Sequence, residues 1–84
     1  MNKALPKIKE DISQLEHVLK TEKDARLKER IHALYLIKSR QATTRISVAN
    51  ILSKYRTTIG DWLNTYEQDG ISGFSFRRVT EERN

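Results

Sequence analysis

Apolar residues in the second half of the chain recur at the spacing of a helix that is buried on one side. They are Ile59, Trp62, Leu63 and Tyr66. At about 3.6 residues per turn they fall within an arc of roughly 100°, which predicts one buried stripe along a helix over residues 56–69. Gly70 follows this helix and can supply the left-handed residue that ends many helices. The stripe favours packing of Trp62 in the core over stacking on a base.

The segment before this helix has the spacing of a shorter helix that runs to about Ser53. Its inward residues are Val48, Ala49 and Leu52. Thr43 or Thr44 can cap its start, and the small Ala49 allows the two helices to approach closely. A turn at residues 53–55 separates them. Two short helices that cross at a tight turn form a helix-turn-helix, whose second helix commonly lies in the major groove of DNA.

The opposite side of the helix at 56–69 is polar. It carries Thr57, Asp61, Asn64 and Gln68, with Gly60 and Thr58 beside them and Arg56 at the start of the helix. Arg56 can bind a phosphate or the two major-groove acceptors of guanine with its forked guanidinium, or it is a solvated charge paired with Asp61. Asp61 either accepts a hydrogen bond from a cytosine amine or, in the interpretation that we favour, orients Arg56. Thr57 and Thr58 can bind phosphates and Asn64 an adenine edge, although exposed polar residues need no function.

Further basic residues flank the helix pair. Those ahead of the second helix are Lys38, Arg40, Arg45 and Lys54. Each can bind a phosphate at the wall of the groove, and each such contact would add to the salt dependence of binding. Near the C-terminus, Arg77 and Arg78 are similar to a basic arm that enters a minor groove. Two glutamates at 81–82 cancel much of the field of that pair.

Two more helices are predicted in the first half of the chain. The first, over about residues 6–21, is amphipathic and has Pro6 in its first turn, where the missing donor costs nothing. Its apolar residues are Ile8, Ile12, Leu15 and Leu19. The second begins after Asp24, which can cap it, and runs to about Ser39. Its apolar residues are Leu27, Ile31, Leu34, Tyr35 and Ile37 on one wide arc, with Leu36 on the other side. The width of the arc makes it the expected central helix.

Composition limits the chain to one small domain. With 84 residues, of which 37% are hydrophobic, it can bury a modest core. We expect this domain over residues 1–76, with Gly73, Phe74 and Phe76 as a hydrophobic latch after the last helix. Residues 77–84 contain too few apolar side chains to pack and are expected to form a flexible tail. The 16 Lys and Arg against 11 Asp and Glu give a net charge of +5, which favours a polyanion as partner.

The sequence also argues against several classes of protein. It has no cysteine, so neither a disulfide scaffold nor a thiolate metal site is expected. No apolar run near the N-terminus has the length of a signal peptide or a membrane span, which predicts a cytoplasmic protein without a membrane partner. His17 and His32 are the only histidines and lie on different predicted helices. We therefore expect no metal, no cofactor and no catalysis by this chain.

Several segments together resemble a known family. They are Asp24 to Arg30, Ala33 to Ile37, Val48 with Ala49, Trp62 with Leu63, Tyr66, and Gly70 to Phe74. This pattern is similar to the N-terminal DNA-binding region of bacterial insertion-sequence transposases of the mariner-like superfamily, over about residues 24–74. The resemblance implies an all-α, homeodomain-like bundle of about four to five helices, with the helix-turn-helix at about 45–69. It also implies recognition of double-stranded DNA at the ends of a mobile element.

The chain departs from this family at three points. Ser53 stands where the family usually has a glycine in the turn, so it must adopt a strained backbone or open the turn. Tyr55 stands where the family usually has a capping Ser or Thr, so we expect Thr57 to cap instead and the helix to begin later. Nothing in the sequence corresponds to the family's metal-dependent nuclease domain. The chain is therefore expected to be a fragment or a free-standing module and not an enzyme.

Three functions stay open at this point. The first is a DNA-binding part of a transposase, as a homodimer or beside a separate catalytic subunit. The second is a transcriptional regulator with the same fold. The third is a protein-interaction module in which the helix at 6–21 docks on a partner or a second copy. Added salt should weaken DNA binding steeply and apolar docking hardly at all.

Overall fold

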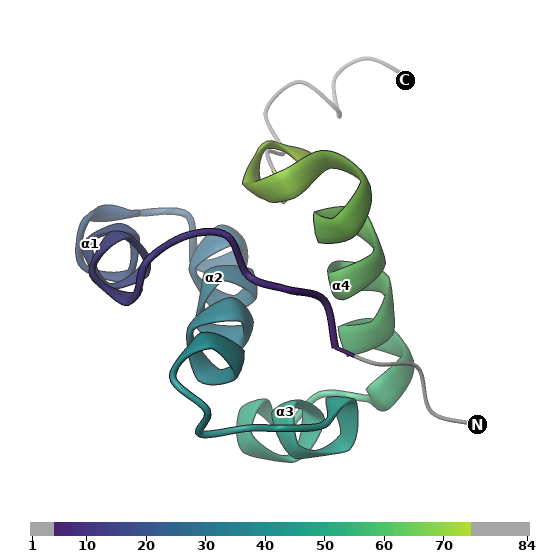
Figure 1. The fold of residues 1–84 in the computed structure, drawn as a ribbon. Helices are drawn as coiled ribbons and strands as arrows, with labels where there is room; N and C mark the ends of the chain where they lie inside the picture. Colours follow the sequence, from purple (N-terminus) through teal and green to yellow (C-terminus); the bar gives the residue numbers. More distant parts are fainter. Residues whose placement is uncertain (1–4, 75–84) are drawn as a thin grey trace, which may run out of the picture.

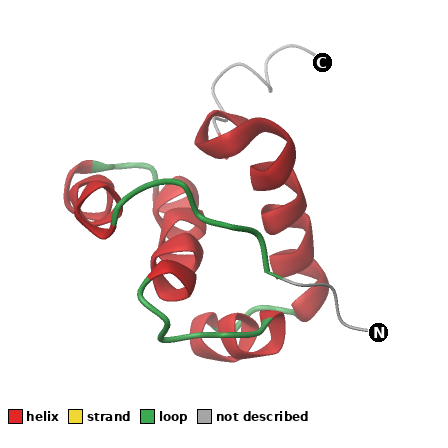
Figure 2. Ribbon diagram, in the orientation of Figure 1, coloured by secondary structure: helices red, strands yellow, loops and turns green. Residues whose placement is uncertain are grey.

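The computed structural model describes residues 5–74, and this part of the chain consists of helices and loops without a β-strand (Figures 1 and 2). Its elements are α1 (Ile12–Thr21), α2 (Ala25–Lys38), α3 (Arg45–Leu52), α4 (Arg56–Asp69) and the 3₁₀ helix η1 (Gly70–Phe74). The predicted all-α architecture is confirmed. In Figure 1, α2 lies in the middle with α1 on one side, α4 on the other and α3 below them.

The described residues bear on the expected absence of a membrane span but not on the predicted tail. None of the helices within residues 5–74 combines the length and the apolar character that a membrane crossing requires. The predicted tail at 77–84 lies outside the described residues, as do Phe76, Arg77 and Arg78.

The core gathers buried side chains from all four described α-helices and from η1. Its largest fully buried side chains are Leu15, Ile31, Leu34, Val48, Ile59 and Leu63. Trp62 and Tyr66 are also buried, so the whole predicted stripe of α4 faces inward. Leu36, predicted to point away from the other apolar residues of α2, is buried as well. The reason is that α2 contacts α1, α3 and η1, so several of its sides face protein.

The ends of α2 and α4 follow the sequence signals. Asp24 caps α2, because its Oδ1 accepts a hydrogen bond from the amide N–H of Arg26 at 2.9 Å. Gly70 ends α4 with φ +69° and ψ −161°, a combination that is open almost only to glycine and differs in ψ from the left-handed cap that we expected. The chain then turns back through η1, and Phe74 is buried with its ring centroid 6.4 Å from that of Tyr66. This confirms Phe74 as part of the predicted latch.

The predicted start of the first helix is wrong. Helix α1 begins at Ile12, where the amide N–H of Asp11 donates to Oε1 of Gln14 at 2.9 Å, and residues 5–10 are not helical. A proline disfavours helical backbone at the residue before it, because its ring clashes with that residue. Pro6 is therefore equally compatible with an extended segment. Ile8 follows the helical spacing but is buried from this segment. Apolar spacing alone could not distinguish these two ways of burying it.

We call residues 5–10 the N-terminal arm. In Figure 1 the arm crosses α2 on its way from the side of α4 to α1. Nζ of Lys38 on α2 donates to the carbonyl oxygen of Ile8 at 3.0 Å. The amide N–H of Lys9 donates to the hydroxyl oxygen of Tyr66 at 2.9 Å, and that hydroxyl donates to Oε1 of Glu10 at 2.6 Å. The arm therefore connects α2 and α4 through hydrogen bonds.

Replacement of Ile59 tests the rotation of α4 about its axis. Ile59→Ala should lower the free energy of unfolding by about 2–5 kcal/mol, because the side chain is fully buried and its loss leaves a cavity. Ile51→Ala is the matched control, since Ile51 is 49% exposed and should change stability by no more than about 0.5 kcal/mol. Urea unfolding measures both. Equal stability of the two variants would contradict the described packing of α4.

Replacement of Tyr66 tests the attachment of the arm. Burial raises the pKa of Tyr66 from 10.0 to about 12, and the hydrogen bond to Glu10 makes the second largest contribution. The folded state therefore binds the phenolic proton more tightly than the unfolded state, and this stabilisation is complete below about pH 10 and lost as the pH rises through about 12. Tyr66→Phe should lower the free energy of unfolding by about 1–3 kcal/mol at neutral pH.

Denaturant titrations of both proteins over a range of pH check this prediction. The difference in stability should be constant up to about pH 10 and should narrow toward pH 12. A difference that does not depend on pH would show that the proton of Tyr66 contributes nothing to the attachment.

Candidate nucleic-acid interface

Helices α3 and α4 are joined by the short turn that the sequence predicts. Thr44 caps α3, because its Oγ1 accepts from the amide N–H of Ser47 at 3.0 Å. Val48 and Ala49 are buried, which places the small side chain of Ala49 between the helices. Ser53 ends α3 with φ 58° and ψ 45°, so it adopts the left-handed backbone for which glycine is favoured. The turn therefore closes despite the serine.

Helix α4 begins at Arg56, as its predicted range has it, and the alternative start after Thr57 is wrong. Tyr55 occupies the position before the helix with an extended backbone, φ −75° and ψ 148°, and makes no capping hydrogen bond with its side chain. This backbone leads the chain directly from the turn into the helix, so Thr57 already lies in the first helical turn. The side chain of Tyr55 is 83% exposed.

The outer side of α4 carries most of the residues expected to contact DNA. Its exposed members are Arg56, Thr57, Asp61, Asn64 and Gln68. Thr58 is half-buried at the edge of this surface. Gly60, predicted to lie beside this polar face and to contact DNA, is instead buried, because the guanidinium of Arg45 lies against it. Gly60 is therefore not available as an open contact on the described surface.

A hollow of about 410 Å³ lies between α3 and the start of α4. Its lining is Ile46, Ala49, Asn50, Lys54, Tyr55, Arg56 and Thr57. The structure thus brings three of the predicted site residues to one place. It also adds Ile46, Asn50 and Tyr55, which sequence reasoning missed. The sequence offered a signal for two of them, because Ile46 and Tyr55 are large apolar residues outside the predicted inward stripes. It offered none for Asn50.

A second hollow, of about 400 Å³, lies on the other flank of α4 and contains Thr58 and Asp61. It also holds Arg30 of α2, whose guanidinium carbon is 4.9 Å from the ring centroid of Trp62. Burial, assisted by the nearby charge of Arg26, lowers the pKa of Arg30. Among the described residues no ion pair joins Asp61 to Arg56. The structure therefore does not support the expected role of Asp61 in orienting Arg56.

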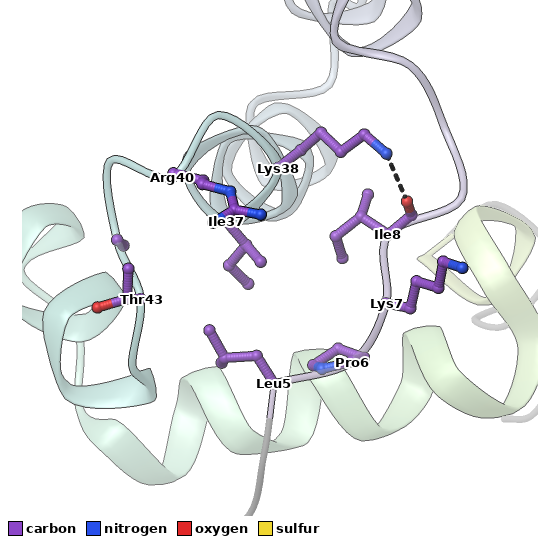
Figure 3. Close-up of a pocket in the computed structure, with 9 residues that line it drawn as sticks. Leu5, Pro6, Lys7, Ile8, Ile37, Lys38, Arg40 and Thr43 are labelled. Carbon is purple, nitrogen blue, oxygen red and sulfur yellow. Dashed lines mark hydrogen bonds between the residues drawn. The ribbon is translucent and has the colours of Figure 1, made fainter.

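Two of the predicted phosphate-binding lysines already have partners in the fold. Nζ of Lys54 lies 3.1 Å from Oε2 of Glu29 on α2. Lys38 binds the arm through the carbonyl of Ile8, as Figure 3 shows, on one side of a hollow of about 480 Å³. Arg40 lines the same hollow and has a positive φ of 65°. Both lysines thus make contacts within the fold whether or not they also contact a ligand.

Charge is unevenly distributed along α4 and the turn before it. Lys54 and Arg56 lie at the start of the helix, together with Arg45 of α3, whereas Asp61, Glu67 and Asp69 follow toward its end. A phosphate backbone would be attracted by the first group and repelled by the second. The arrangement therefore favours contact with a polyanion at the start of α4.

Comparisons with known proteins do not change this description. No family model, no curated protein and no solved structure matches the chain.

The turn can be tested through Ser53. Ser53→Gly should raise the free energy of unfolding by about 0.5–1 kcal/mol, because an L-residue in the left-handed region costs about 1–2 kcal/mol and the greater freedom of unfolded glycine offsets part of the gain. Ser47→Gly, inside α3, is the control and should be destabilising. Urea unfolding compares the two. A loss of stability in both variants would mean that Ser53 is not strained.

Proposed function

We propose that this chain binds double-stranded DNA with α3 and α4 as a helix-turn-helix of the homeodomain-like type. In this arrangement α3 crosses the backbone and the exposed side of α4 enters the major groove. The observation that carries the proposal is the two-sidedness of α4. Ile59 and Leu63 are fully buried while Thr57, Asp61 and Asn64 are exposed, so a continuous polar face follows a cluster of basic residues.

The proposal assigns different roles to the residues around the start of α4. Arg56 and Thr57 lie in the first turn, from which base edges are commonly contacted. Arg56 has the donors for a bidentate contact to guanine. Asn64 lies about two turns further along the same face and can pair with an adenine edge. Lys54 and Arg45 bind phosphates and so position the helix without reading sequence.

The biological setting that we propose is recognition of the ends of a mobile element, following the resemblance to transposases. Catalysis would then come from another polypeptide, and the binding module could act as a homodimer. A transcriptional regulator would use the same surface in the same way. The docking alternative finds little support in α1, because Leu15 is fully buried against the core and Val18 and Leu19 are partly buried there.

Selection of bound duplexes from a random pool at two salt concentrations tests the proposal. The full chain should enrich a short motif, and the logarithm of its binding constant should fall linearly with the logarithm of the salt concentration. Failure to bind any duplex at low salt would overturn the proposal. Binding that is unaffected by salt would point to an apolar contact with another partner.

Replacement of Arg56 tests the proposed base contact. Arg56→Ala should weaken binding to the selected duplex by about 1–3 kcal/mol and relax the preference at one base pair. Arg26→Ala is the matched control, because it removes the same charge from the start of α2, where the side chain is 66% exposed and lines a hollow with Leu19 of α1. Equal affinities of the two variants, with the fold intact, would exclude Arg56 from the site.

A further inference from the structure

Gly60, the buried glycine of α4, lies against the guanidinium of Arg45 of α3. A Cβ atom built on Gly60 would come within 2.8 Å of Nη1 of Arg45, which is too close for an undisturbed contact. Apart from the helix's own backbone and the adjoining residues, no other atom lies within 4 Å of that position. The missing side chain of Gly60 therefore makes room for the guanidinium of Arg45 and for nothing else in the described structure.

Gly60 also has no conformational reason to be glycine. Its φ lies outside the positive range that strains other residues, and it is in the interior of a regular helix. A glycine there costs roughly 0.5–1 kcal/mol relative to alanine. The sequence thus accepts a less stable helix at the one point where Arg45 approaches it.

Two of the three nitrogens of the guanidinium that occupies this space lack acceptors. Nε and Nη2 of Arg45 are buried, and neither has a hydrogen-bond partner within the described part of the chain. The two ion pairs of described residues involve other side chains. Buried donors without acceptors are unfavourable, and those of an arginine are well matched to the oxygens of a phosphate. Arg45 is the first residue of α3, at the end of the helix pair where the basic residues gather.

We propose that Gly60 is a positioning residue that seats Arg45 against α4, so that its guanidinium binds a phosphate of the DNA backbone beside the groove. This inference rests on the proposed DNA binding and adds a specific arrangement to it. Gly60 contributes by having no side chain, and Arg45 makes the contact. A small rotation of the guanidinium, which stays against Gly60, gives its buried donors access to phosphate oxygens.

The proposal separates the effect of one substitution on stability from its effect on binding. Gly60→Ala should leave the melting temperature unchanged or raise it by up to about 5 °C, because alanine favours the helix and the displaced guanidinium is the end of a flexible side chain. The same substitution should weaken duplex binding about tenfold, because the new Cβ displaces the guanidinium of Arg45 from its position against α4. A substitution with a purely structural effect would change both quantities in the same direction.

The experiment compares the full-length wild type with Gly60→Ala, Arg45→Ala, the double variant and the control Arg26→Ala. Duplex affinity is measured over a series of salt concentrations, and the melting temperature is measured without DNA. Gly60→Ala and Arg45→Ala should each reduce the salt slope by about 1, as expected for the loss of one phosphate contact. The double variant should bind as Arg45→Ala does, because the glycine acts only through the arginine. Arg26→Ala should retain the wild-type slope.

Each other result overturns a defined part of the argument. If Gly60→Ala has the affinity and the salt slope of the wild type, Arg45 does not need the space at Gly60 to bind DNA. Additive losses in the double variant would show that Gly60 acts on DNA by another route. A melting temperature well below that of the wild type in Gly60→Ala would mean that the glycine serves packing alone. If the wild type itself fails to bind any duplex at low salt, the proposed function fails, and this is recognised before any variant is compared.

Discussion

The burial of the apolar stripe of α4 is the constraint on which the rest of the structure depends. Ile59 and Leu63 are fully buried, and a helix can turn about its axis only if such side chains leave the core. Their burial therefore fixes which side of α4 faces outward. Trp62 marks one edge of the buried side, where the guanidinium of Arg30 lies over its ring and adds a cation–π attraction. Gly60 marks the other edge. The outward surface lies between these two arginine-covered edges.

Many basic side chains of this protein contribute to its own fold, so net charge alone overstates the positive surface. Lys54 connects the turn to Glu29 of α2, and Lys38 connects α2 to the arm. A partly exposed ion pair such as the first contributes little to stability, but it keeps the amine near the start of α4. Within the helix pair, the positive charge that a polyanion would meet lies at the start of α4, whereas other exposed lysines, such as Lys7, Lys20 and Lys28, lie elsewhere on the molecule.

Local signals in the sequence were enough to predict most of the helices. The period of apolar residues identified α2 and α4, and Asp24 and Thr44 marked the starts of α2 and α3, because a cap requires only contacts within one turn. The arm was missed because Ile8 keeps helical spacing while it is buried from an extended segment. That burial depends on Tyr66 and Lys38, which are far from it in sequence.

The candidate site was harder to predict for the same reason. Exposure of Arg56, Thr57 and Asn64 follows from the phase of one helix, so it could be derived locally. The burial of Gly60 could not, since it requires a side chain from α3 to reach across to α4. The exposure of the Tyr55 and Ile46 side chains also depends on how the two helices cross. A periodic pattern of apolar residues does not contain that information.

The hydrogen bonds of the arm have a consequence for the order of folding. The bond between Lys9 and Tyr66 joins residues 57 positions apart, whereas the turns that connect α2, α3 and α4 bring together residues that are close along the chain. Closing a long loop costs more chain entropy than closing a short one, so the three later helices can associate before the arm is attached. Segments that join last and through few contacts are also the first to open. Opening of the arm would expose Ile8 and the hydroxyl of Tyr66 to water while leaving the pairing of α3 and α4 in place.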